Sequence, residues 1–289
     1  MRRLSIGISG WRYTPWRGTF YPEDWPQKRE LEYAASKLNS IEINGSFHSL
    51  QRPESYQLWY EQTPKDFVFS VKGGRFITHM KKLRDVETPL ANFVASGVLA
   101  LNEKLGPILW QFPPNMPFDL DRFEAFFELL PRDTEAGAKF AKGHDAKLKH
   151  RALTRTDRRR PIRHAVEIRR AEFVVPEFMA LLRKHQIALV FADTAGRWPY
   201  TEDLTADFVY ARLHGAEELY VSGYTDAALD WWADRVRAWR KGSEPPDARR
   251  LLKAQPPRRR GRDVYVYFDN DAKVKAPFDA MSLAAKLNA

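Results

Sequence analysis

The chain has 289 residues, of which 44% are hydrophobic and none is cysteine. The hydrophobic content is enough for a large buried core, whereas the lack of cysteine excludes disulfides, thiol nucleophiles and zinc-thiolate sites. No long apolar run follows the N-terminal Met-Arg-Arg or appears elsewhere. We therefore expect a cytoplasmic protein that makes no membrane contact.

The formal net charge of +10 is concentrated in two stretches. Residues 139–163 contain ten Lys and Arg but only two Asp, and residues 249–262 contain seven Lys and Arg and no acid. These stretches belong to segments 131–161 and 242–262, which we interpret as basic insertions that are disordered in part. The basic character of the chain is therefore local.

Eight short apolar runs, each ending in a polar or charged residue, are separated by stretches with helical periodicity or by turn-rich loops. In chain order the expected strands are 4–9, 40–44, 67–72, 107–111, 164–169, 188–193, 208–214 and 264–270. The expected helices are 29–38, 53–62, 85–105, 120–130, 176–185, 225–240 and 277–287. Residues 194–206 contain Gly196 and Pro199 and are expected to form a loop or a short helix. Repeated β-α units of this kind predict a (β/α)₈ TIM barrel, with residues 1–289 as one domain.

Alternation along the strands indicates which side chains point into the barrel. Ile41 and Ile43 share one face of their strand, and Glu42 and Asn44 share the other. Active sites of TIM barrels lie at the C-terminal ends of the strands, here called the mouth. The polar residues predicted to line one cavity at the mouth are Glu42, Asn44, Lys72, Gln111, Glu167, Arg169, Asp193, Arg212, His214 and Asn270. The alternative is a set of paired charges that only fixes the packing of the interior.

Glu42, Glu167 and His214 are the candidate catalytic residues. Two carboxylates can divide acid and base work if their surroundings separate their pKa values. Arg169 is expected to favour the ionised form of Glu167, which leaves Glu42, near Asn44, as the candidate protonated acid. His214 ends its strand and is a candidate base, acid or ligand.

Lys72, Arg169 and Arg212 form a set of cations that suits a phosphate or carboxylate ligand. Ion pairing of these cations with Glu42, Glu167 and Asp193 is the alternative. His79 follows the third strand and is a further candidate for ligand contact. With His214, the three acids could also hold a divalent ion, Mg²⁺ or Mn²⁺ rather than Zn²⁺, although no metal-binding motif is present. A histidine that only donates or accepts hydrogen bonds is the simpler alternative to a metal ligand.

Aromatic residues crowd the loop after the first strand, at Trp11, Tyr13, Trp16, Phe20 and Tyr21. Exposed, they would stack on a sugar ring or a base, and buried, they would form a packed lid. Arg158, Arg159 and Arg160 in the first basic insertion could bind nucleic acid by neutralising phosphates. A solvated run of charge is the alternative for these arginines.

Long, ordered motifs that span nearly the whole chain carry a family resemblance. The segments GISGWRYTPWRGTFYP, SIEINGSFHSLQRPESYQLWYEQTP, FVFSVKGGRFITH, KLGPILWQFPP, HAVEIR, FVYARLHG and YVYFDNDAKVKAPFDA are similar to the YecE-like family, domain of unknown function seventy-two. The resemblance implies a (β/α)₈ barrel but no defined activity. It singles out Trp11, Tyr13, Trp16, Tyr21, Glu42, Asn44, Phe47, Lys72, Thr78, His79, Gln111, Glu167, Arg169, Arg212, His214, Gly215, Tyr224, Asn270 and Asp271. His48 departs from the family, which more often has tyrosine after the phenylalanine.

We interpret the chain as an enzyme, a hydrolase, lyase or isomerase, that acts at its mouth on an anionic small molecule containing phosphate or sugar. By analogy of fold, the barrel resembles the endonuclease-four and xylose-isomerase type, which makes metal-assisted chemistry one alternative. The rival hypotheses are a nucleic-acid-binding protein or metal-dependent nuclease of that type, and a non-catalytic barrel that binds a ligand.

Overall fold

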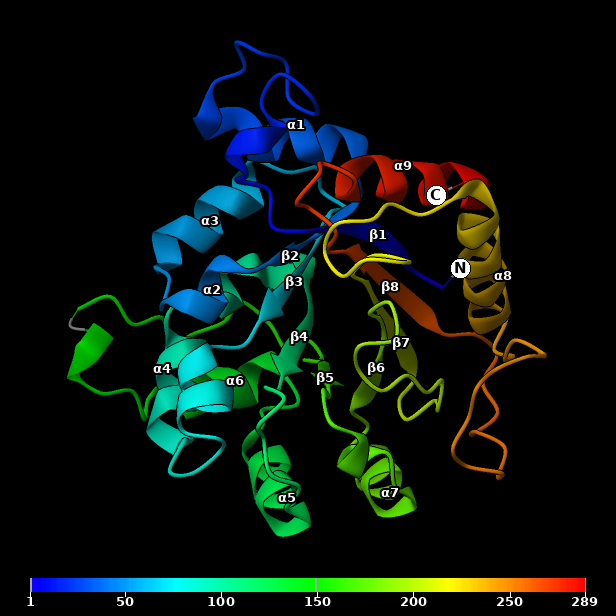
Figure 1. Ribbon diagram of the computed structural model, residues 1–289. Coiled ribbons are helices and arrows are strands. Elements are labelled where there is room, and N and C mark those ends of the chain that lie inside the picture. The colour runs from blue at the N-terminus through cyan, green and yellow to red at the C-terminus, as the bar shows by residue number, and fades with distance from the viewer. Residues whose placement is uncertain (1, 149, 289) are drawn as a thin grey trace.

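A computed structural model describes residues 2–148 and 150–288 and confirms the predicted TIM barrel. Eight parallel strands pair in chain order, and β1 pairs with β8 to close the barrel. The strands are β1 Leu4–Ser9, β2 Ser40–Ile43, β3 Val68–Lys72, β4 Leu105–Gln111, β5 His164–Glu167, β6 Ala188–Asp193, β7 Phe208–Leu213 and β8 Asp263–Phe268. Figure 1 shows helices surrounding this sheet on its outer side.

The helices match most of the predicted ranges. They are α1 Glu30–Lys37, α2 Gly45–His48, α3 Pro53–Glu61, α4 Glu87–Ala95, α5 Leu120–Leu129, α6 Thr134–Ala141, α7 Pro176–Lys184, α8 Asp226–Arg240 and α9 Ala276–Leu287. Local sequence explains several of the starts: Pro53 occupies the first turn of α3, and the Asp119 side chain caps α5 by accepting from the backbone N–H of Arg122. The prediction of one helix over 85–105 was wrong, because Gly97 adopts a φ of 120° and separates α4 from the 3₁₀ segment Val98–Lys104.

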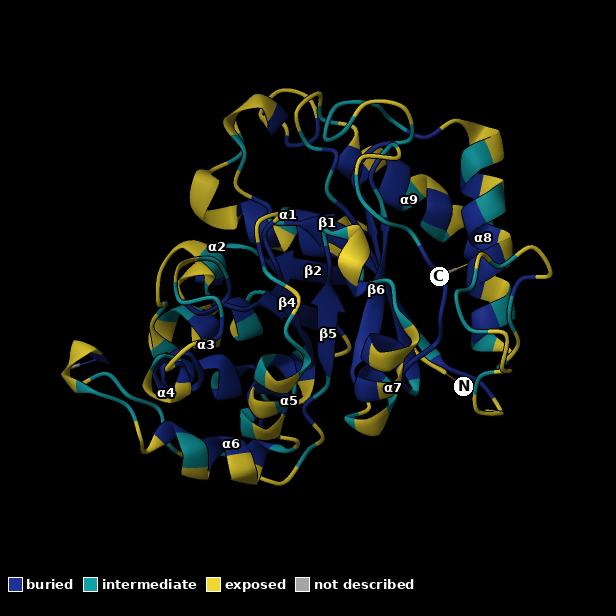
Figure 2. Ribbon diagram, turned by 60° about the horizontal axis from the view of Figure 1, so that its bottom comes forward, coloured by how far each residue is buried: buried dark blue, intermediate teal, exposed yellow. Residues whose placement is uncertain are grey.

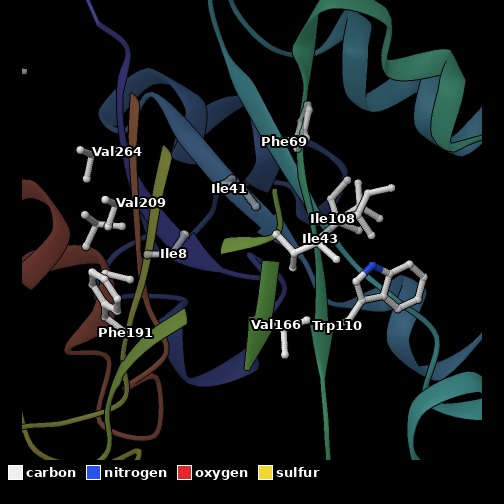
Figure 3. Packing of buried hydrophobic residues seen from close by; sticks show 14 of the residues in the cluster. Ile8, Ile41, Ile43, Phe69, Ile108, Trp110, Val166, Phe191, Val209 and Val264 are labelled. Atoms are coloured by element: carbon white, nitrogen blue, oxygen red, sulfur yellow. The ribbon is translucent and has the colours of Figure 1, made fainter. Parts of the chain in front are cut away.

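The two faces of each strand have different neighbours. Ile8, Ile41 and Ile43 point outward and pack with other apolar side chains under the surrounding helices (Figure 3). Inside the barrel, Leu109, Tyr210 and other residues form a second cluster. Figure 2 shows the strands buried and the exposed residues concentrated on the outer helices and loops. The alternation that the sequence predicts for β2, β3, β5 and β7 is therefore present.

Both basic insertions contain packed structure. Segment 131–161 includes α6, which the charge pattern did not predict and which packs against α4. The Thr134 hydroxyl donates to the carbonyl of Arg158 at 2.7 Å and so ties the end of the insertion to α6. In segment 242–262, the buried Arg262 side chain donates to the carbonyls of Gly242 and Pro257, both at 2.9 Å. Buried hydrogen bonds of this kind hold a loop in one conformation.

The insertions lead directly into β5 and β8, so their last residues lie at the N-terminal end of the barrel. The mouth is at the opposite end of the same strands. Among the helices that the structure describes, none is both long enough and apolar enough to cross a membrane.

Candidate active site

Four ionisable side chains meet inside the barrel just below its mouth: Glu42, Glu167, Arg212 and Asp269, here called the ion-pair cluster. Arg212 lies 2.8 Å from Glu42, 2.7 Å from Glu167 and 2.8 Å from Asp269, measured between nitrogen and oxygen atoms. The side chains of Arg212 and both glutamates have no solvent exposure, whereas 14% of the Asp269 side chain is exposed. The sequence predicted three of these residues but missed Asp269.

The guanidinium of Arg212 has no N–H donor left for a ligand. Nε and Nη2 donate to the two oxygens of Glu42, Nη1 donates to Glu167, and Nη2 also donates to Asp269. The second N–H of Nη1 points to Nε2 of His214 at 3.2 Å. An arginine side chain has five N–H donors, and here each has a protein acceptor. The prediction that Arg212 binds an anion is therefore wrong, and its role is the ion-pairing alternative.

Glu42 accepts hydrogen bonds on both oxygens. Besides Arg212, the Ser9 hydroxyl donates to Oε1 at 2.8 Å and the Tyr210 hydroxyl donates to Oε2 at 2.6 Å. Donors on every side are the surroundings of an ionised carboxylate, because a protonated acid needs an acceptor for its own proton. The geometry contradicts the expectation that Glu42 is the protonated acid.

Glu167, at the end of β5, is held by donors in the same way. Gln111 donates from Nε2 to its Oε1 at 2.8 Å, and Arg169 donates from Nε to the same oxygen at 3.1 Å. Burial would raise the pKa of Glu167, but the charges of Arg212 and Arg169 outweigh burial and hold this pKa well below its usual range. As expected, the neighbouring arginine favours the ionised form.

His214 is buried and contacts the ion-pair cluster through both ring nitrogens. Nε2 accepts from Arg212, so the ring proton of the neutral form is on Nδ1, which lies 3.0 Å from Oδ2 of Asp269. Burial would raise the pKa of Asp269, but Arg212 and His214 outweigh it and hold that pKa below its usual range. His214 is thus held through Nε2 by Arg212, while its buried Nδ1 has no hydrogen-bond partner among the described residues.

Lys72, the last residue of β3, lies in the layer above the cluster and has only 8% of its surface exposed. Its Nζ lies 4.4 Å from the centre of the Phe47 ring. Within the described residues no carboxylate oxygen lies within 4.0 Å of this Nζ. Burial and the positive charge of Arg212 lower the pKa of Lys72 to about 8.

Arg169 follows the end of β5 and donates to Glu167 of the ion-pair cluster. Its guanidinium stacks on the Trp198 ring with 3.7 Å between Cζ and the ring centre, and Nη2 donates to the Tyr220 hydroxyl at 3.1 Å. The side chain of Arg169 is 12% exposed. Trp198 and Tyr220 belong to loops after β6 and β7, where the sequence offered no periodicity to place them.

His79 and Lys72 both contact the Phe47 ring. The ring centres of His79 and Phe47 are 5.0 Å apart. Nδ1 of His79 shares a hydrogen bond of 2.8 Å with the Thr78 hydroxyl. Burial and the charges of Lys72 and Arg169 lower the pKa of His79 to about 4. The ring is therefore neutral near pH 7 and can accept or donate a hydrogen bond.

Two predicted residues point away from the barrel interior. Asp193 shares the outward face of β6 with Phe191 and accepts from the Tyr224 hydroxyl at 3.0 Å. Asn270 donates to Asp279 of α9 at 2.8 Å. Neither side chain joins the ion-pair cluster, and the expectation that they line the same cavity was wrong. Directly after β8, Asp269 continues the inward alternation of Tyr265 and Tyr267, a signal that was available in the sequence.

The aromatic loop after β1 is mainly a packed lid. Trp16, Phe20 and Tyr21 are buried, and Trp11 is 7% exposed. Trp11, Tyr13 and Asn44 nevertheless line a separate cavity of about 280 Å³ beside the mouth, together with Trp59. The buried Oδ1 of Asn44 has no hydrogen-bond partner among the described residues. These three predicted residues thus lie together, but in a neighbouring cavity.

In residues 2–148 and 150–288, no group of three or more Asp, Glu or His side chains is placed to hold a metal ion. The predicted metal set is not assembled, because Asp193 faces outward while Arg212 occupies oxygens of Glu42 and Glu167.

Arg158, Arg159 and Arg160 lie in the insertion near the base of the barrel and pair with acids. Arg158 lies 3.7 Å from Asp157, and Arg159 lies 2.9 Å from Asp133. Arg160 pairs with Asp157 and lines a cavity of about 260 Å³ with Arg3, Arg163 and Asp263, which lie where strands begin. The mouth and this arginine run are at opposite ends of the barrel.

Solved structures with this fold extend over the whole chain. The chain is similar to a DUF72 family protein from Thermotoga maritima, with a TM-score of 0.76, 22% identity, and 99% of this chain and 100% of that chain covered. A DUF72 family protein from Enterococcus faecalis gives a TM-score of 0.70 and 16% identity, with 99% and 96% covered. At these identities the likeness shows the fold alone.

Curated relatives match a shorter part. UPF0759 protein YecE of Escherichia coli strain K12 is 27% identical over 157 residues, which cover 52% of this chain and 55% of that protein. UPF0759 protein YunF of Bacillus subtilis is 27% identical over 116 residues, which cover 38% of this chain and 40% of that protein. The chain thus spans about half the length of the curated relatives it matches. The family model described as "Protein of unknown function DUF72" matches residues 5–289, and the chain therefore belongs to the DUF72 family.

Proposed function

We propose that the chain is an enzyme that acts at the mouth of its barrel on a small anionic molecule containing phosphate or sugar. One observation carries the proposal: Lys72 is a nearly buried cation without a carboxylate partner within 4.0 Å among the described residues. A buried cation is costly unless it is paired, and an anionic ligand would supply the pair.

The surroundings of Lys72 suit such a ligand. Arg169 is partly exposed and is held flat against Trp198, so that its fork has a fixed orientation toward a phosphate or carboxylate. Phe47 and Trp198 hold the two cations in place, because Lys72 lies over the Phe47 ring and Arg169 over the Trp198 ring. His79 adds a neutral imidazole.

The ion-pair cluster has a supporting role in this proposal. Glu42, Glu167 and His214 are buried and contact Arg212; within the cluster, Glu167 positions Arg169 and Arg212 positions Asp269. In this proposal the groups that contact the substrate are Lys72, His79, Arg169 and Asp269. Hydrolysis, elimination and isomerisation all use a cation that stabilises developing negative charge.

Calorimetric titration with inorganic phosphate and with ribose 5-phosphate tests the proposal. Lys72→Met and Arg169→Met should each weaken binding by about 1.5–3 kcal/mol, the scale of a hydrogen bond to a charged group. Arg170→Met is the matched control, because Arg170 is the next residue and pairs with Glu172 instead. Binding that is equal in all three variants would place the anion elsewhere, and binding without turnover of any substrate would favour the non-catalytic barrel.

A further inference from the structure

We propose that Lys72 is a covalent catalytic residue whose Nζ forms an imine with the carbonyl carbon of a small aldehyde or ketone. The inference rests on the proposed function for one point, the negative charge of the substrate. The imine is argued separately, from the surroundings of Lys72. The substrate class is then a phosphorylated or carboxylated carbonyl compound.

The surroundings of Lys72 suit a nucleophile, because no protein acceptor in the described part of the chain engages its Nζ. It ends β3 on the inward face, directly above Ser70, and its Nζ contacts the Phe47 ring. In the described part of the chain, its Nζ has neither a hydrogen bond nor an ion pair within 4.0 Å. An amine must offer a lone pair to attack carbon, and a nitrogen held in a salt bridge or in several hydrogen bonds cannot do so.

A second lysine of this chain shows the contrast. Lys104 is also buried, with 3% exposure, but its Nζ donates to the carbonyls of Tyr60 and Thr63 at 2.5 Å and 2.8 Å. A third hydrogen bond goes to the Thr63 hydroxyl at 3.1 Å. Burial lowers the pKa of Lys104 too, but these acceptors use all three donors of its ammonium and so engage the nitrogen. Burial alone therefore does not distinguish Lys72, but burial without acceptors does.

The surroundings of Lys72 increase the neutral fraction of its amine, although Asp269, Glu42 and Glu167 act in the opposite direction. Burial and the charge of Arg212 lower the pKa of Lys72 to about 8. At pH 7, Lys72 is therefore neutral in about one molecule in ten. Desolvation beside a second cation is an established physical route to a nucleophilic lysine.

The step balances without any further reactant. The neutral Nζ attacks the carbonyl carbon, the C–N bond forms, and the carbonyl oxygen takes up a proton to give a carbinolamine. The C–O bond then breaks and water leaves. Overall, one ammonium and one carbonyl compound give one protonated imine and one water, with no change in charge and no oxidant. Asp269, whose charge acts on Lys72, faces the same positive charge before and after the step.

Reductive trapping tests the inference on the intact chain. The probes are glycolaldehyde phosphate and uncharged glycolaldehyde, each with sodium cyanoborohydride at pH 7, which converts an imine into a stable secondary amine. Intact mass and peptide mapping then locate the adduct. We expect one adduct per chain with glycolaldehyde phosphate, on the peptide that contains Lys72, and none on the peptide that contains Lys104. Adducts spread over exposed lysines, with no excess at Lys72, would overturn the inference.

Lys72→Arg tests the nucleophile directly. This variant removes the amine and keeps a positive charge, so the specific adduct should disappear. Phosphate binding is measured on the wild-type chain. If Lys72→Arg does not fold, the peptide map of the wild-type chain still shows whether the adduct is on Lys72. Phosphate binding without an adduct would reject the imine and leave the proposed function standing. Equal trapping of uncharged glycolaldehyde and glycolaldehyde phosphate would support the imine and contradict the anionic substrate.

Discussion

Arg212 and Glu42 are joined inside the barrel by two parallel hydrogen bonds, Nε to Oε2 at 3.1 Å and Nη2 to Oε1 at 2.8 Å. Both side chains are completely buried, and they come from strands β7 and β2 on different sides of the barrel. A buried pair of this geometry is strongly coupled to the fold, because either partner alone would be an uncompensated charge in a medium of low dielectric constant.

Arg212→Met should therefore act on stability before it acts on any ligand. It leaves three carboxylates facing one another, and we expect the free energy of unfolding to fall by about 3–5 kcal/mol. Chemical denaturation measures this change. Arg237→Met is the control, since its exposed pair with Asp234 on α8 should contribute at most about 1 kcal/mol. A similar small effect for Arg212→Met would show that the cluster is not needed for folding.

The ionisation of Lys72 should be visible in its reactivity. The neutral amine is the reactive form, so labelling with acetic anhydride should reach half of its maximal rate near pH 8 at Lys72. A free lysine side chain in a reference peptide reaches it near pH 10.4. Mass spectrometry of the labelled peptides gives both curves in one sample, and a single curve near pH 10.4 would contradict the effect of burial.

The same shift predicts how stability depends on pH. The pKa of Lys72 is lower in the folded state than the 10.5 of the free side chain, so the unfolded chain binds more protons between pH 8 and 10.5. Stability from this group rises across that window. In Lys72→Met, the slope of unfolding free energy against pH should be correspondingly less positive.

His164 should make the fold sensitive to acid. Its Nδ1 accepts from the Trp110 indole at 3.1 Å and its Nε2 donates to the carbonyl of Pro131 at 2.9 Å, which fixes a neutral ring. Burial, the largest cause, lowers its pKa from 6.5 to about 3. The unfolded chain therefore binds more protons between these values, and stability falls as the pH falls, by up to about 5 kcal/mol at the lower end. Urea denaturation from pH 7 to 3.5 should show less of this slope in His164→Asn.

If nucleic acid is a partner, the arginine run of the first insertion should govern its salt dependence. Replacing Arg158, Arg159 and Arg160 with Ser should reduce the slope of log affinity against log salt by up to about three phosphate contacts. The barrel should keep its stability, since exposed ion pairs contribute little. The matched control replaces the exposed Arg258, Arg259 and Arg260 of the second insertion. Weak binding to DNA and RNA with the same slope in all proteins would remove the nucleic-acid hypothesis.

The fold was predictable because a parallel barrel buries both faces of each strand and so leaves short apolar runs in the sequence. β1 and β6 begin and end at the predicted residues. In contrast, α6 is a short helix that directly precedes the basic run and was therefore not predicted, and the break at Gly97 depends on one backbone angle.

The part of the site that lies on strands was predictable, because alternation along a strand shows which side chains point inward. Glu42, Glu167 and Arg212 follow from it, whereas the expected strand 264–270 extends two residues beyond β8 and so points to Asn270 in place of Asp269. The sequence did not predict which of these charged side chains form ion pairs with one another. That depends on distances across the barrel, between residues far apart in sequence such as Glu42 and Arg212.

Each basic insertion contains a run of three arginines, Arg158–Arg160 and Arg258–Arg260. Their position limits where a bound nucleic acid could lie on the protein. Both runs lie before the strands begin, and a strand of six residues is about 20 Å long. A nucleotide held by Arg160 at the base could not at the same moment lie against Lys72. Nucleic acid bound there would be a tether that localises the protein, and the mouth would remain free to act on a separate small molecule.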